Sequence, residues 1–207
     1  MHPDAAAPLS IELAARKIPV QTPDASARIQ VAEQYAFQPI HTARLNLIKS
    51  GRLGTVTQAQ VSVAHDYHGM SLIRRFLGIN FEDAVIRGVA FKSPLVEGAG
   101  RGGPPQQERI IESSQTIVTL DFGSRLGVYD FTGNQYFACI RSPRVLIRGE
   151  RGEINNDKIS WLADFRTPLQ STFVRQEAGQ DGNLEGFHLK GIMAGGEWAY
   201  VNPSALR

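Results

Sequence analysis

The stretch TVTQAQVSVAHDYHGMSLIRRFLG, residues 55–78, decides the fold that this sequence predicts. Residues 55–64 form a strand-like run, and a turn carrying His65, Tyr67 and His68 follows it. A histidine at such a turn can act as a proton donor, acceptor or ligand at neutral pH; the alternative is a capped helix with a surface histidine. Apolar side chains then recur with the one-sided spacing of a buried helix over about residues 69–77, at Leu72, Ile73, Phe76 and Leu77.

The chain around this segment predicts one helix before it and mainly strands after it. Pro39 and the pair Ser50-Gly51 bracket an apolar pattern that is typical of a helix with proline in its first turn. The clearest hairpin joins residues 115–122 to residues 126–131 through a short glycine-containing loop. Its alternation of polar and apolar residues predicts one solvent-exposed face and one buried face. Further strands are predicted over residues 84–93, 144–148, 158–162, 171–177 and 186–190.

These elements predict an α+β fold: a large, open, mainly antiparallel sheet of six or more strands, with helices packed on one face. The other face must then meet solvent or a partner, so we expect a homo-oligomer that assembles through the open sheet face. Residues 1–28 are too short for a domain of their own, and residues 29–207 are predicted to form the α+β domain. Residues 97–107, rich in glycine and proline, are expected to form a mobile loop.

The composition narrows the class of protein. The 207 residues are 42% hydrophobic, which is enough for a core, and a net charge of +2 with no basic tract argues against a nucleic-acid partner. The single cysteine, Cys139, excludes an intrachain disulfide framework. No apolar run approaches the roughly 20 residues of a membrane-spanning helix, and Met1 is not followed by a secretory signal pattern. We therefore expect a cytoplasmic protein without a membrane partner.

Three kinds of chemistry are disfavoured by the spacing of the candidate residues. Gly98, Gly100 and Gly103 satisfy G-x-G-x-x-G, but Pro104-Pro105 leads into a strand-like run, whereas the dinucleotide motif must open a helix. His65 and His68 are spaced like two metal ligands, yet no third ligand is placed beside them, so no metal site is expected. A hydrolase triad has no support, because no G-x-S-x-G nucleophile turn is present.

Two polar residues before the Pro39 helix allow two interpretations. Gln34 and Tyr35 lie in an otherwise apolar neighbourhood, where they could face a pocket or cap the helix, and composition alone favours capping.

Several blocks of sequence, taken together, resemble a known family. Residues 30–39 (QVAEQYAFQP), residues 47–56 (LIKSGRLGTV) and the histidine segment occur in the order seen in the C-terminal domain of the glucose-fructose oxidoreductase/inositol dehydrogenase (Gfo/Idh/MocA) family. Residues 145–154 (VLIRGERGEI) are similar to the late I-x-G-x-x-G strand and turn of that family. The resemblance covers about residues 28–162, and it implies an α+β domain that follows a Rossmann domain.

The resemblance also implies a site and a cofactor. Members act on sugars and cyclitols with NAD or NADP, so the implied partner is a small carbohydrate-like substrate. His68 falls on the family's catalytic histidine, because the spacing to the closing Gly78 is kept. Tyr35, His65 and Tyr67 are then candidate substrate contacts. The candidate cofactor contacts are Thr22, Pro23 and Gln34.

The chain departs from the family pattern at two of three catalytic markers. The aspartate of Asp-x-x-x-His corresponds to Ala64, and the lysine of Glu-Lys-Pro corresponds to Thr22. The start of the chain resembles only the last helix and strand of a Rossmann domain, so the chain looks like a truncated member, and we do not expect it to bind the nucleotide alone. The sequence leaves two hypotheses open: a substrate-binding and assembly domain of a sugar or cyclitol oxidoreductase, or a non-catalytic binding or oligomerisation module derived from that family.

Overall fold

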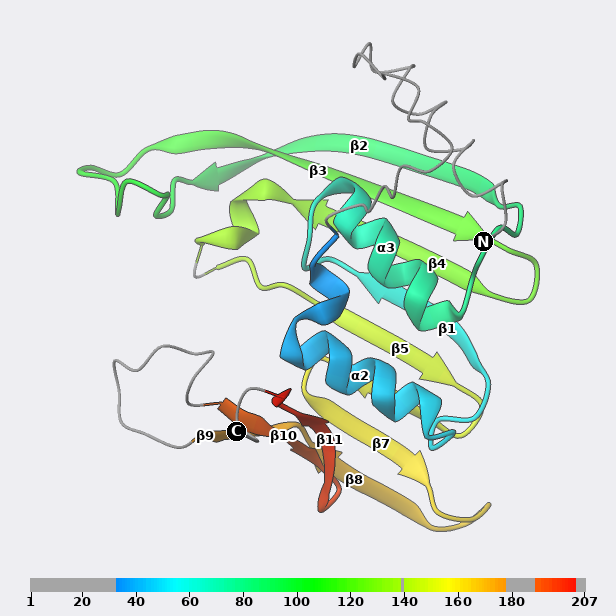
Figure 1. Ribbon diagram of the computed structural model, residues 1–207. Helices are drawn as coiled ribbons and strands as arrows, with labels where there is room; N and C mark the ends of the chain where they lie inside the picture. The colour runs from blue at the N-terminus through cyan, green and yellow to red at the C-terminus, as the bar shows by residue number, and fades with distance from the viewer. Residues whose placement is uncertain (1–32, 139, 178–188, 204–207) are drawn as a thin grey trace, which may run out of the picture. The chain divides into compact units, whose positions relative to one another are not determined.

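The computed structural model describes residues 33–138, 140–177 and 189–203. Among them, two helices and eleven strands form a large mixed sheet and a second, smaller sheet, which confirms the predicted α+β class (Figure 1). The predicted Rossmann-like remnant, residues 1–28, lies outside the described residues. No helix among the described residues has the length and apolar character needed to cross a membrane.

The large sheet has eight strands in the order β2-β3-β4-β1-β5-β6-β7-β8. The neighbouring strands β1 and β4 are parallel, and every other neighbouring pair in this sheet is antiparallel. The strands are β1 (Val56–Val61), β2 (Val85–Val96), β3 (Ile110–Asp121), β4 (Leu126–Thr132), β5 (Val145–Gly149), β6 (Gly152–Asn155), β7 (Lys158–Leu162) and β8 (Pro168–Thr172).

Helices α2 (Pro39–Lys49) and α3 (Asp66–Leu77) lie on one face of the large sheet (Figure 1). Helix α3 packs on β1 and β4, whereas α2 also contacts the three-stranded sheet. That small sheet has the order β11-β10-β9 and consists of β9 (Val174–Glu177), β10 (Leu189–Ala194) and β11 (Glu197–Val201). Two short 3-10 turns complete the described elements, η2 (Tyr35–Phe37) before α2 and η3 (Gly133–Tyr136) after β4.

The hydrophobic core lies between the helices and the sheet. Leu72, Ile73 and Phe76 of α3 are almost completely buried, as the helical spacing predicts. The buried face predicted for β3 is also confirmed, because Val118 and Leu120 pack against this core. The core continues across the sheet through fully buried residues of the later strands, namely Val145, Ile147, Ile154 and Ile159.

The structure corrects several predicted elements. Helix α3 begins at Asp66 and not near residue 69, so His68 lies inside its first turn. Strands β2 and β3 pair without interruption from Val85 to Val96, so they are longer than predicted. The predicted strand 171–177 is two strands in different sheets, because Phe173 is buried between them. The predicted strand 186–190 begins at Leu189 among the described residues, and β6 and β11 were not predicted as separate strands.

Candidate functional site

The predicted histidine segment lies where β1 ends and α3 begins. His65 is the N-cap residue of α3, but its side chain makes no capping hydrogen bond. Asp66 has a φ of 41°, a left-handed conformation that is uncommon for a residue other than glycine. Its backbone N–H donates to the Tyr129 hydroxyl at 2.8 Å. Such local strain persists where the surrounding structure holds it, and it clusters at functional sites.

Gly69 lets the sheet approach the first turn of α3. A Cβ atom at this position would lie 2.6 Å from Cε2 of Tyr129 and 2.9 Å from the carbonyl oxygen of Ala64. Real Cβ contacts are not this short, so the close packing of Tyr129 on the helix requires glycine here. The first turn of α3 is thereby held against Tyr129 of β4.

His68 is buried and paired with a carboxylate that sequence reasoning did not single out. Its Nδ1 lies 2.5 Å from Oε2 of Glu33, and the two side chains are only 9% and 10% exposed. The other carboxylate oxygen, Oε1, accepts the backbone N–H of Tyr35 at 2.8 Å. Both oxygens of Glu33 therefore have partners, and one of them is the imidazole.

Three rings surround the His68 imidazole. The ring centroid of Tyr67 is 4.1 Å away, that of Tyr35 is 4.5 Å away, and that of His65 is 4.9 Å away. Tyr67 is about half exposed, so part of its ring is available to a ligand. The four residues predicted as catalytic or substrate-binding are thus in contact with one another.

Tyr136, in the η3 turn, links the remaining polar groups of the cluster. Its hydroxyl lies 2.7 Å from Nδ1 of His65 and accepts the backbone N–H of the same residue at 3.1 Å. Burial, and then a side-chain hydrogen bond with Tyr136, raise the pKa of Tyr35 to about 12. The Tyr35 hydroxyl therefore keeps its proton at neutral pH and can serve as a hydrogen-bond donor.

The predicted cofactor contacts lie mostly outside the part of the chain that the structure describes. Thr22 and Pro23 lie outside the described residues, and Gln34 is exposed without a side-chain hydrogen bond. The capping interpretation of Gln34 and Tyr35 is wrong, because the N-cap residue of α2 is Gln38 and it makes no side-chain capping bond. In the described ranges, no three His, Cys, Asp or Glu side chains lie close enough together to hold a metal ion.

The glycine-rich segment joins two strands and does not open a helix. Gly98, Gly100 and Gly103 lie between β2 and β3, and a bridge pairs Gly100 with Gly103. At its base, Arg109 binds both carboxylate oxygens of Glu97, at 2.9 and 2.6 Å. This confirms that the segment lacks the helix N-terminus on which a pyrophosphate would sit.

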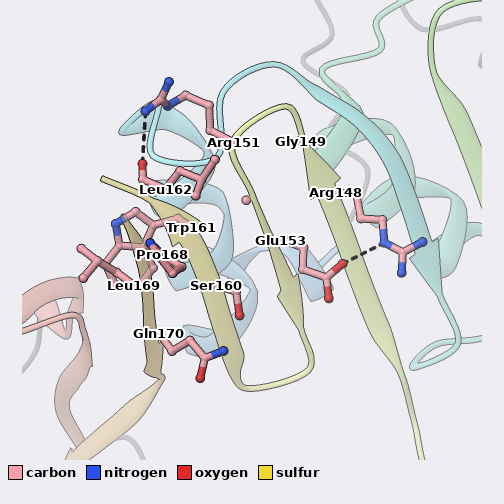
Figure 2. Close-up of a pocket in the computed structure, with 11 residues that line it drawn as sticks. Arg148, Gly149, Arg151, Glu153, Ser160, Trp161, Leu162, Pro168, Leu169 and Gln170 are labelled. Carbon is pink, nitrogen blue, oxygen red and sulfur yellow. Dashed lines mark hydrogen bonds and ion pairs between the residues drawn. The ribbon is translucent and has the colours of Figure 1, made fainter. Parts of the chain in front are cut away.

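A cavity of about 340 Å³ lies over β5 to β8 (Figure 2). Its arginines already have partners: Arg148 donates to Glu153 at 2.8 Å, and Arg151 donates to the carbonyl oxygen of Leu162 at 3.2 Å. Neither of the two histidines of the cluster lines this cavity. We therefore place the candidate site at the His65–His68 cluster, where an imidazole nitrogen is free.

His41 is a second buried histidine that sequence reasoning missed. It lies in α2, where Nη1 of Arg44 contacts its Nδ1 at 3.0 Å. Burial, and then the positive charge of Arg44, lower the pKa of His41 to about 3, so the ring stays neutral at physiological pH. Arg44 also donates to the backbone oxygen of Asn156 at 2.8 Å and so ties α2 to the turn between β6 and β7.

Comparison with known proteins gives only distant similarity. No protein-family model matches the sequence, and no curated protein sequence matches it. Solved structures that resemble it include levoglucosan dehydrogenase in complex with NADH and levoglucosan, at 15% identity over 69% of this chain and 46% of that one, with a TM-score of 0.44.

Two further structures give a similar result. One is an NAD-binding oxidoreductase from Klebsiella pneumoniae, at 14% identity over 78% of this chain and 50% of that one, with a TM-score of 0.46. The other is an inositol dehydrogenase homologue from Azotobacter vinelandii complexed with NADH and myo-inositol, at 13% identity over 86% and 48%, with a TM-score of 0.41.

The chain spans about half the length of each of these proteins. All three are oxidoreductases, the class that the sequence blocks resemble. Identities and TM-scores this low assign neither a family nor an activity to the chain.

Replacement of His41 by glutamine should remove a pH dependence of stability. Glutamine still offers an oxygen to Arg44 but does not titrate. Because the pKa of His41 is about 3 in the folded protein and 6.5 in a model peptide, the unfolded chain binds the extra proton, and the stability due to the neutral ring is lost as pH falls below 6.5.

We expect the advantage of the wild type over His41→Gln to fall by about 2 kcal/mol between about pH 7 and about pH 5, as measured by urea unfolding. Parallel stability curves for the two proteins over this range would contradict the buried, neutral state of His41.

Proposed function

We propose that this chain is the substrate-binding and assembly domain of an NAD(P)-dependent oxidoreductase that acts on a hydroxyl or carbonyl group of a sugar or cyclitol. The observation that carries the proposal is the state of His68, whose Nδ1 is held by Glu33 while Nε2 has no hydrogen-bond partner among the described residues. The sequence blocks that resemble the Gfo/Idh/MocA family support the same class of substrate.

The Nε2 atom is open to a ligand. Among the described residues, Gln135 Nε2 is the only buried side-chain nitrogen or oxygen without a hydrogen-bond partner. His68 Nε2 also has no hydrogen-bond partner among the described residues, although His68 is only 7% exposed. A ligand hydroxyl that reached this nitrogen would find it within a cluster of rings.

The surroundings of His68 suit a polyol. The Tyr35 hydroxyl, whose hydrogen bonds to Tyr136, can accept a hydrogen bond from a ligand, and the His65 imidazole offers a second polar group. Tyr67 presents a half-exposed ring on which the C–H face of a sugar or cyclitol can pack. A few polar groups beside aromatic surface are the usual composition of a small-molecule site.

The described residues do not fit a nicotinamide nucleotide. They contain no glycine-rich turn that opens a helix, and Gln34 makes no side-chain contact that would prepare it for a cofactor. The cofactor implied by the resemblance supplies hydride transfer in such enzymes. We therefore propose that the described part binds the substrate and that the nucleotide site lies elsewhere, in another part of the protein or in a companion subunit.

Polyol titrations test this proposal. We expect myo-inositol or levoglucosan, at millimolar concentration, to shift the NMR signals of His65, Tyr67 and His68 in a saturable manner. His68→Ala should abolish the response. Gln170→Ala, which changes the cavity over β7 and β8, should leave it intact. NADH and NADPH should not bind this chain alone in parallel calorimetric titrations.

Each outcome of these titrations separates the hypotheses. Saturable binding of either nucleotide would show an autonomous dehydrogenase. It would contradict the proposal that the nucleotide site lies elsewhere. The absence of any saturable polyol response would instead favour a non-catalytic oligomerisation module, in which the histidines only position α3.

We propose that the open face of the large sheet pairs with a second copy of the chain. Strand alternation and register place Val85, Val89 and Phe91 of β2 with Leu126 of β4 on the face away from α3, and all four are exposed. Several exposed apolar side chains on one sheet face are typical of an association surface. The open sheet gives the same patch to both copies of a two-fold dimer.

Light scattering tests this assembly. We expect a mass of at least a dimer for the wild type and a shift toward the monomer for Val89→Lys, because burying an unpaired ammonium group at the interface is costly. Ser114→Lys is the matched control, since Ser114 is exposed on the opposite face of the same ribbon. A monodisperse wild-type monomer would contradict the proposed pairing.

A further inference from the structure

The Glu33 carboxylate fixes which nitrogen of His68 carries a proton. An ionised carboxylate only accepts hydrogen bonds, so the Nδ1 atom 2.5 Å from Oε2 must be the donor. This holds for the neutral ring and for the imidazolium, because both can carry hydrogen on Nδ1. In the neutral ring, Nε2 is then left without hydrogen and acts as an acceptor.

Glu33 is itself held in place. Its second oxygen accepts the backbone N–H of Tyr35, and the carboxylate is only 10% exposed. The imidazole has little room to turn, because the rings of Tyr35, Tyr67 and His65 lie within 5 Å of its centroid. The geometry therefore fixes both members of the pair and leaves Nε2 without a hydrogen-bond partner among the described residues.

The other nearby acidic side chains do not take this role. Asp66 is exposed, and its contribution to the cluster is the backbone bond to Tyr129. Asp130 is buried, but one of its oxygens binds Arg144 at 2.5 Å and the other binds Gln115. Position 64, two residues before the helix, is a fully buried alanine. Glu33 is thus the carboxylate among the described residues that contacts His68.

We infer that Glu33 is a positioning residue that locks His68 in the Nδ1–H tautomer, so that Nε2 accepts a hydrogen bond from a substrate hydroxyl. The identity of that hydroxyl compound as a sugar or cyclitol rests on the proposed function. The tautomer itself does not, since it follows from the contact between Glu33 and His68.

The tautomer can be measured in the ligand-free protein. In water a free histidine side chain favours hydrogen on Nε2, so removal of the carboxylate should let the ring revert. Long-range ¹H–¹⁵N correlation spectra of ¹⁵N-histidine-labelled protein distinguish the two forms. We expect predominantly Nδ1–H for neutral His68 in the wild type, predominantly Nε2–H in Glu33→Ala, and the wild-type pattern in the control Gln34→Ala.

A wild-type His68 ring in the Nε2–H form would overturn the inference even if Glu33→Ala failed to fold. An unchanged tautomer in folded Glu33→Ala would overturn it equally. If a polyol binds, Glu33→Ala should weaken that binding about tenfold, the loss expected for one hydrogen bond.

The same spectra separate this inference from the proposed function. An Nδ1–H ring that changes on removal of Glu33, in a protein that binds no polyol, supports the role of Glu33 and contradicts the substrate proposal. Polyol binding by a protein whose His68 is in the Nε2–H form contradicts the role of Glu33 alone.

Discussion

The contact between Glu33 and His68 joins two parts of the chain that are 35 residues apart, and the candidate site depends on it. It fastens the segment before α2 to the first turn of α3, and it brings Tyr35 over the imidazole. Burial of an ionised carboxylate is costly unless its oxygens have partners, and here one partner is the histidine and the other is a backbone N–H. The same contact occupies Nδ1 of the imidazole and leaves Nε2 without a hydrogen-bond partner among the described residues.

The sheet beneath the site explains why the reactive group lies at this position. Helix α3 follows β1 and leads across the sheet face to β2, and the antiparallel pairs β2–β3 and β3–β4 then bring β4 parallel beside β1. Tyr129 of β4 packs on Gly69 and bonds the backbone of Asp66, so the sheet sets the direction of the helix start. The positions of His65, Tyr67 and His68 therefore follow from packing between the helix and the sheet.

Much of this fold could be predicted because its signals are local. The spacing of Leu72 and Phe76 marks α3, and the hairpin of β3 and β4 is visible from its turn and its alternation. The division at Phe173 could not be predicted, since only the long-range pairing of β8 with β7 and of β9 with β10 shows that the chain passes there from one sheet to the other. The length of β2 and β3 also could not be predicted, because long-range pairing extends both strands beyond their apolar pattern.

The candidate site likewise has residues that could be predicted from the sequence and residues that could not. The residues at 65, 67 and 68 are neighbours in sequence, so they could be recognised as one candidate segment. Glu33 and Tyr136 come from distant segments, and nothing in their local sequence marks them as partners of His68 and His65. Pairing across such distances is a property of the tertiary structure, and so the carboxylate that holds His68 could not be found by motif spacing.

A double-mutant cycle on Glu33 and His68 tests the central contact most directly. The free energies of unfolding of the wild type, Glu33→Ala, His68→Ala and the double variant are compared, with Gln34→Ala and His68→Ala as the control pair. A charge-assisted hydrogen bond between groups that are about 90% buried should give a coupling free energy of about 1–3 kcal/mol, against less than about 0.5 kcal/mol for the control. Additivity of the Glu33 and His68 substitutions would contradict the account, because it would mean that the two side chains do not hold each other in the folded protein.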